Sequence, residues 1–72
     1  MNTIFNVGNT VILKAEPNAG EMVVSDITEK YYNISNSSAD NPVYHCKYWN
    51  DKEQKFIIGH FLGHEIELVR KS

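Results

Sequence analysis

Metal binding in this 72-residue chain would depend on four side chains: His45, Cys46, His60 and His64. Structural zinc sites usually take four Cys or His ligands, often in closely spaced pairs. His45 and Cys46 are adjacent, and adjacent side chains on a strand point to opposite faces, so they do not readily share one ion. The segment between His60 and His64 contains Gly63, which indicates a turn rather than a helix. We therefore expect no metal ion and no cofactor.

Nucleophilic catalysis would depend on Cys46, which is the only cysteine. A reactive cysteine needs some exposure and a pKa lowered by a helix N-terminus or an adjacent cation. Cys46 stands between Tyr44 and Tyr48 on a strand face that we expect to point inward, where a free cysteine behaves as a small hydrophobic side chain. No pair of carboxylates stands out as acid and base, because Asp51 and Glu53 fall in a predicted turn. The sequence therefore predicts that the protein is not an enzyme.

Short β-strands are the elements that would position these side chains. Helical periodicity is poor, and runs of β-branched and aromatic residues alternate with turn signals. The predicted strands are residues 10–14, 21–27, 43–49, 54–61 and 66–69. A polar segment at about 28–42 predicts a long flexible loop between the second and third strands, and residues 70–72 predict a frayed tail. We expect one all-β domain over residues 1–72, a small five-stranded antiparallel barrel or partly open sandwich that curls to protect its edges.

The third predicted strand indicates which strand faces point inward. Successive side chains on a strand alternate between its two faces. Lys47 is charged and should contact water, so its face is the outward one. The outward set is then Val43, His45, Lys47 and Trp49, and the inward set is Tyr44, Cys46 and Tyr48. On the first two strands the inward positions are Val11, Leu13, Met22 and Val24.

The fourth predicted strand holds more apolar residues than one face can bury. With Phe61 inward, Ile57 and Gly59 follow it, and Gly59 is either a β-bulge or a point of close packing. The outward positions of this strand are Phe56, Ile58 and His60. Over the whole chain, the apolar residues beyond those that a five-stranded interior needs are Ile12, Val23, Trp49, Phe56 and Ile58. Either the N-terminal segment 3–5 or the long loop covers them in a second small core, or they form an exposed patch for a partner.

Aromatic side chains near the surface are the best candidates for a binding surface. The candidate residues are Trp49, Phe56, Tyr31, Tyr32 and His45. Aromatic-lined grooves bind proline-rich peptides, and convergent aromatic rings bind methylated lysine. The acidic residues close to them in sequence slightly favour a basic partner, and they are Asp26, Glu29, Asp40, Asp51 and Glu53.

Charge and cysteine content narrow the function classes. The chain has seven Lys or Arg and nine Asp or Glu, a net charge of −2 and a pI of about 5.8. Nucleic-acid binders usually carry a basic patch, and the basic residues here are scattered, so nucleic acid is not an expected partner. A single cysteine excludes an internal disulfide, and with no signal-peptide pattern this favours the cytoplasm. No apolar run approaches the roughly 18 residues of a membrane span, so no membrane partner is expected.

Four segments taken together resemble one known family. They are "FNVGNTVILK" (5–14), "GEMVV" (20–24), "CKYWND" (46–51) and "F…EIELV" (61–69). In this order they resemble the YodC-like family of small uncharacterised bacterial proteins, over most of the chain. Asn9 stands where that family has an aspartate, and the loop at 28–42 is longer. The resemblance implies an SH3-like barrel and brings no catalytic residues.

Two functions follow as expectations. The first is a non-enzymatic protein-binding or self-associating β-barrel module, whose partner is an unidentified protein or a second copy in a homodimer. The alternative is a nucleic-acid-associated SH3-like barrel of the ribosomal or transcription type, because "VGNTVILK" (7–14) resembles the opening strand of such barrels. The acidic net charge argues against the alternative, since a surface that follows phosphates should be basic.

Overall fold

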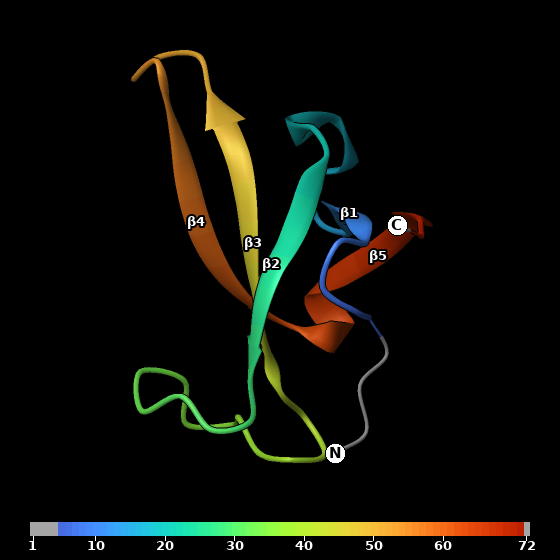
Figure 1. The fold of residues 1–72 in the computed structure, drawn as a ribbon, viewed down its shortest axis with the longest axis vertical. Coiled ribbons are helices and arrows are strands. Elements are labelled where there is room, and N and C mark those ends of the chain that lie inside the picture. Colours follow the sequence, from blue (N-terminus) through green and yellow to red (C-terminus); the bar gives the residue numbers. More distant parts are fainter. Residues whose placement is uncertain (1–4, 72) are drawn as a thin grey trace.

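Five strands and two short 3₁₀ helices make up the fold (Figure 1), and the computed structural model describes residues 5–71. The strands are β1 (Thr10–Leu13), β2 (Met22–Thr28), β3 (Val43–Asn50), β4 (Lys55–Leu62) and β5 (Ile66–Arg70). The 3₁₀ helices are η1 (Pro17–Ala19) and η2 (Gly63–Glu65). Each strand begins and ends within one residue of its predicted range. The agreement is close because Gly, Pro and Asn residues between the strands are strong local turn signals.

The described strands form one antiparallel sheet in the order β4-β3-β2-β1-β5, so the prediction of an all-β, five-stranded antiparallel fold is confirmed. β2, β3 and β4 stand side by side in Figure 1, and β5 lies beyond β1. Among the described strands β5 pairs with β1 but not with β4, so β4 and β5 are the two edges and the sheet does not close into a barrel. Register shifts between Val24 and Asp26 and between Thr10 and Val11 mark local irregularities of the kind that bend a sheet.

The core lies on the inward face that strand alternation predicts. Its buried members are Phe5, Val11, Met22, Val24, Tyr44, Cys46 and Ile66. Leu13, Ile27, Tyr48 and Phe61 are partly buried against them. The Phe5 and Tyr44 rings meet edge to face, with centroids 5.2 Å apart. The inward assignment of the Cys46 face is therefore confirmed.

Val43 was predicted to point outward, and that prediction is wrong. Val43 is fully buried, although it shares a strand face with the exposed Lys47. It begins β3 directly after the buried Pro42 and pairs with the buried Leu62 of β4. Alternation fails here because the chain leaving the long loop buries both faces at this end of the sheet.

Gly59 is a point of close packing and not a β-bulge. The β3–β4 register runs without a shift and pairs Gly59 with Cys46. A Cβ atom on Gly59 would lie 2.6 Å from the ring of Phe61, which is closer than carbon atoms pack. The missing side chain therefore leaves room for the Phe61 ring over the strand.

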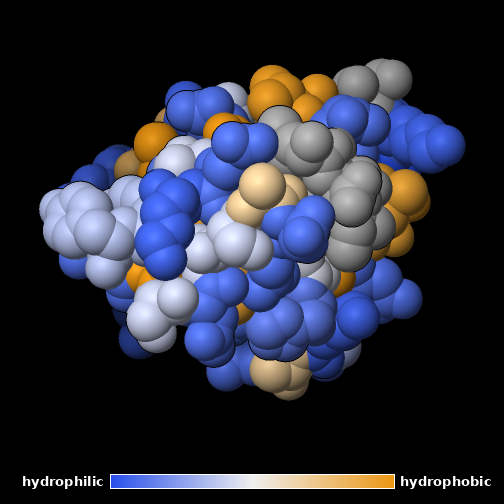
Figure 2. All heavy atoms as spheres, turned by 90° about the horizontal axis from the view of Figure 1, so that it is seen from below, coloured by the Kyte–Doolittle hydropathy of each residue, from blue (hydrophilic) through white to orange (hydrophobic). Residues whose placement is uncertain are grey.

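The loop between β2 and β3 is held by hydrogen bonds of its own. Ser37 is buried, and its hydroxyl accepts the backbone N–H of Tyr31 at 2.8 Å and lies 2.6 Å from the carbonyl oxygen of Ile34. The backbone of Ser38 pairs with that of Asn41 in both directions. Figure 2 views the molecule from the end where this loop lies, and the surface there is largely hydrophilic. The loop thus fixes the position of Tyr31 at the end of the sheet.

The chain ends match their predictions in part. Phe5 of the predicted covering segment packs into the inward core, while Thr3, Ile4 and Ser72 lie outside the described residues. Arg70 belongs to β5, and its guanidinium donates to the Glu21 carboxylate at 2.9 Å. None of the helices in the described part of the chain has the length and apolar character that crossing a membrane requires.

Candidate functional site

Side chains on the outward side of β3 and β4 form a continuous row. Three cross-strand pairs make up this row: Trp49 with Phe56, Lys47 with Ile58, and His45 with His60. Facing residues of an antiparallel pair lie close enough for their side chains to touch. The row runs from the β3–β4 turn to the end of the sheet where the long loop lies. These six side chains are called the hairpin face below.

At the turn end of the hairpin face, Trp49 and Phe56 form an exposed aromatic pair. Their ring centroids are 5.1 Å apart, with an interplanar angle of 74°. The indole Nε1 of Trp49 donates to Oδ1 of Asp51 at 2.7 Å, and Lys47 Nζ lies 4.7 Å from the centroid of the Phe56 ring. Trp49 remains 48% exposed and Phe56 60% exposed. Aromatic rings already fixed in position lose little entropy on binding and are favourable anchors for a protein contact.

The middle of the hairpin face is apolar and extends onto β2. Ile58 is 51% exposed. On the other side of Lys47, the β2–β3 register places Val23, which is 46% exposed. A half-exposed apolar surface therefore crosses three strands, with the single cation of Lys47 at its centre.

The loop end of the hairpin face is a cluster of histidine and tyrosine rings. The ring centroids of His45 and His60 are 4.6 Å apart, and Tyr31 stacks on His60 at 4.9 Å. Tyr32 stacks in turn on Tyr31 at 5.6 Å. Thr28 Oγ1 and His45 Nε2 share a hydrogen bond of 2.7 Å, which ties the cluster to β2. The long loop therefore contributes two aromatic rings to the same side of the sheet.

The histidine pair predicts a pH dependence of stability. Burial lowers the pKa of His45, the charge of His60 lowers it further, and Asp26 acts in the opposite direction. As the pH falls through 6.5, the ordinary histidine value, the unfolded chain binds a proton that the folded chain resists. The free energy of unfolding should therefore fall on acidification in this range. Thermal melts followed by circular dichroism between about pH 8 and about pH 5 check this expectation.

A matched pair of variants tests whether His45 causes that pH dependence. His45→Gln should flatten the dependence of the melting temperature on pH, because the residue that resists protonation is gone. His64→Gln changes an exposed residue of η2 and should leave the dependence in place. An equal slope in the wild type and His45→Gln would contradict the role of His45.

All five candidate site residues lie on the outward side of the sheet, in two groups. Trp49 and Phe56 are at the turn end, and Tyr31, Tyr32 and His45 are at the loop end. Among their outward neighbours, Val23 and Ile58 were already expected in an apolar patch, whereas Lys47 and His60 were not among the candidate residues. Strand alternation had already placed these four outward. The missing signal was the cross-strand register, which decides which outward residues touch.

Cys46 and the histidines do not form an activated centre. Cys46 is fully buried, and burial raises its pKa to about 11, so almost none of it is thiolate at neutral pH. As predicted, His45 and Cys46 point to opposite faces of β3. Within residues 5–71, no group of three or more His, Cys, Asp or Glu side chains is placed to hold a metal ion. The arrangement offers a contact surface rather than a nucleophile.

Three basic side chains of the described residues contact a neighbouring carboxylate or aromatic ring. Lys55 Nζ lies 3.8 Å from the Glu53 carboxylate, and Arg70 pairs with Glu21. Lys47 lies over the Phe56 ring.

Comparison with known proteins gives no relatives: no family model, no curated protein and no solved structure matches this chain. The candidate site is therefore interpreted from its geometry. The resemblance to the YodC-like family accordingly rests on the four short segments quoted above.

Proposed function

We propose that the chain is a non-enzymatic protein-binding module that associates with a second copy of itself through the hairpin face. The observation that carries this proposal is the half-exposed apolar row of Trp49, Phe56 and Ile58, extended across β2 by Val23. Contiguous exposed apolar side chains with a polar rim are typical of protein interaction sites. Apart from Lys47 these side chains carry no charge, and few charged residues are typical of the centre of an interface.

A second copy is favoured as the partner by the charges around the hairpin face. A two-fold axis brings the same surface of both copies together, so the surface must be complementary to itself. Lys47 and Lys55 lie on the strands, and Asp51 and Glu53 lie in the turn that joins them. Two antiparallel hairpins can therefore bring the lysines of one copy near the carboxylates of the other. A domain of this size also has a marginal core, which a partner subunit would support.

The proposed cellular setting and family relationship are supported by the single cysteine and by four short sequence segments. The buried free thiol of Cys46 and the absence of disulfides within the described residues support a reducing, cytoplasmic setting. The four short segments support a distant relationship to the YodC-like family, whose SH3-like strand pattern would be consistent with a binding role. The net charge of −2 and the scattering of Lys and Arg along the sequence give no support to the nucleic-acid alternative.

Sedimentation equilibrium tests the proposed self-association. We expect a monomer–dimer equilibrium with a dissociation constant on the order of 10–100 μM, because the apolar area is small and small interfaces bind weakly. Trp49→Ala should raise the dissociation constant at least about tenfold, as expected for a central aromatic anchor. Val69→Ala is the matched control, because Val69 is 40% exposed and lies on β5, at the opposite edge of the sheet from β4.

Two results would contradict the proposal. One is a wild-type protein that stays strictly monomeric at millimolar concentration. The other is a dimer that Trp49→Ala leaves intact, which would move the interface away from the hairpin face. Circular dichroism of both variants checks that the fold is retained, since each change removes an exposed side chain.

A further inference from the structure

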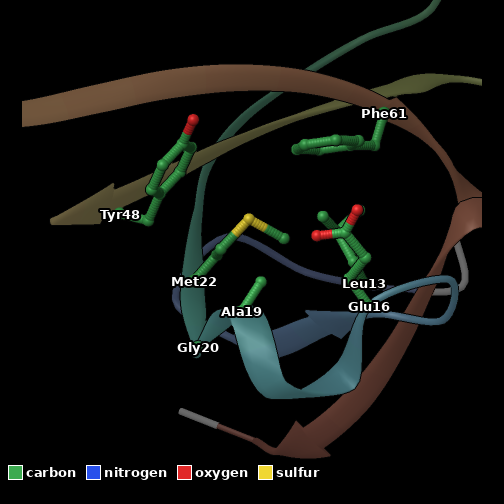
Figure 3. A pocket seen from close by; sticks show the side chains of 7 residues that line it. All are labelled: Leu13, Glu16, Ala19, Gly20, Met22, Tyr48 and Phe61. Carbon is green, nitrogen blue, oxygen red and sulfur yellow. The ribbon is translucent and has the colours of Figure 1, made fainter. Parts of the chain in front are cut away.

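A cavity opens on the inward side of the sheet, away from the hairpin face (Figure 3). It has a volume of about 210 Å³ and lies where η1 and its flanking turn face β3 and β4. Its walls come from five segments of the chain, and the side chains that matter here are Leu13, Glu16, Met22, Tyr48 and Phe61. These side chains either point inward or, in the case of Glu16, approach from the turn before η1.

Two aromatic rings form opposite parts of this pocket. Tyr48 and Phe61 pack against the core on one side and remain only half-buried, so part of each ring lines the open space. Figure 3 shows both rings around the cavity, with the Met22 thioether between them. The faces of aromatic rings attract cations, most strongly where water is partly excluded. The walls therefore suit a group that is apolar in its stem and positively charged at its head.

The Glu16 side chain supplies a negative charge at the same place. In Figure 3 its carboxylate points into the pocket, below the Phe61 ring and beside the end of the Met22 side chain. The turn is fixed locally, because the Glu16 carbonyl oxygen accepts the backbone N–H of Ala19 at 3.0 Å. Within residues 5–71, no side chain or backbone group donates a hydrogen bond to this carboxylate, and no cation pairs with it. A carboxylate in a pocket that two aromatic rings also line favours a cationic ligand and disfavours an anion.

We propose that this pocket binds the alkylammonium end of a lysine side chain from another protein. The methylene stem would pack on Leu13 and Met22, and the ammonium would lie against the open ring faces at the mouth of the pocket and donate to Glu16. The cavity is smaller than the roughly 300–1,000 Å³ of ordinary small-molecule pockets, which suits a single side-chain end. The site lies on the inward side of the sheet, so it is independent of the self-association proposed for the hairpin face.

An NMR titration with matched model compounds tests this assignment. The probe is N-acetyl-lysine methylamide, and the control is N-acetyl-norleucine methylamide, which lacks the charge. We expect amide shifts around Glu16, Met22, Tyr48 and Phe61 with millimolar affinity for the lysine compound. The norleucine compound should bind at least about threefold more weakly, the contribution of one solvent-accessible ion pair. Equal binding of the two compounds, or no shifts with either, would overturn the proposal.

Variants locate the site and separate it from the dimer interface. Glu16→Gln should weaken lysine binding about three- to fivefold and remove its dependence on salt. Glu29→Gln changes an exposed residue of the long loop and should alter neither the affinity for the lysine compound nor its dependence on salt. Tyr48→Leu should weaken binding as well, provided that its melting temperature shows a folded protein; if it unfolds, Glu16→Gln decides alone. Trp49→Ala should alter dimerisation and leave lysine binding unchanged, so the two proposals fail separately.

Discussion

Cys46 in the folded protein should react with iodoacetamide at least about 100-fold more slowly than in the unfolded chain. The thiolate is the nucleophile, and a pKa of about 11 in place of the ordinary 9.0 reduces its fraction by about this factor below pH 9. Full burial between Tyr44 and the neighbouring strands adds a steric barrier to the reagent. Mass spectrometry of the alkylated protein over time, with and without guanidinium chloride, measures both rates.

Any slow alkylation of Cys46 in the folded protein should come from molecules in which the sheet has opened. Alkylation should occur only through opening of the sheet, so its rate should rise with denaturant well before global unfolding is complete. A short peptide containing one cysteine provides the rate of a fully accessible thiol. A folded-state rate within about tenfold of that peptide would mean that Cys46 is exposed and that the face assignment of β3 is wrong.

Tyr44→Ala should reduce the free energy of unfolding by about 3–5 kcal/mol, the range for removing a buried aromatic side chain. Tyr44 is fully buried, and its ring packs edge to face on Phe5 at 5.2 Å. The change therefore removes both apolar burial and an aromatic contact that ties the start of the chain to β3. Domains of this size have stabilities near the lower end of about 5–15 kcal/mol, so the variant should be partly unfolded at 25 °C.

Urea denaturation followed by the fluorescence of Trp49 measures this loss. Tyr32→Ala is the matched control, because Tyr32 is 86% exposed and its loss should change the stability by no more than about 0.5 kcal/mol. A Tyr44→Ala variant within about 1 kcal/mol of the wild type would show that the ring is not a central part of the core.

The sequence alone was sufficient for the strands and for most of the core. Alternation around the charged Lys47 placed Tyr44 and Cys46 inward and His45 outward, as the structure does. The polar segment before Val43 was correctly predicted as the long connection between the second and third strands. These features follow from local patterns, since side chains alternate with a period of two and turn residues interrupt the strands.

Only the tertiary structure decided which side chains meet. Val43 broke the alternation because the returning loop buries the end of the sheet. Gly59 was fixed as a packing point by the Phe61 ring, two residues further along the same strand. The sheet is open because β4 and β5 form its two edges and do not pair with each other, which the pattern of each strand alone does not specify.

In both candidate binding surfaces, the sequence predicts side-chain directions and the tertiary structure decides which side chains are neighbours. Trp49 and Phe56 were outward by alternation, but their contact depends on the β3–β4 register. Tyr48 was inward by alternation and Glu16 carried no signal in the sequence; the two share a pocket only because the turn before η1 folds over the inward face. The direction of a side chain is set by local periodicity, whereas its neighbours are set by long-range pairing, which a single sequence does not specify.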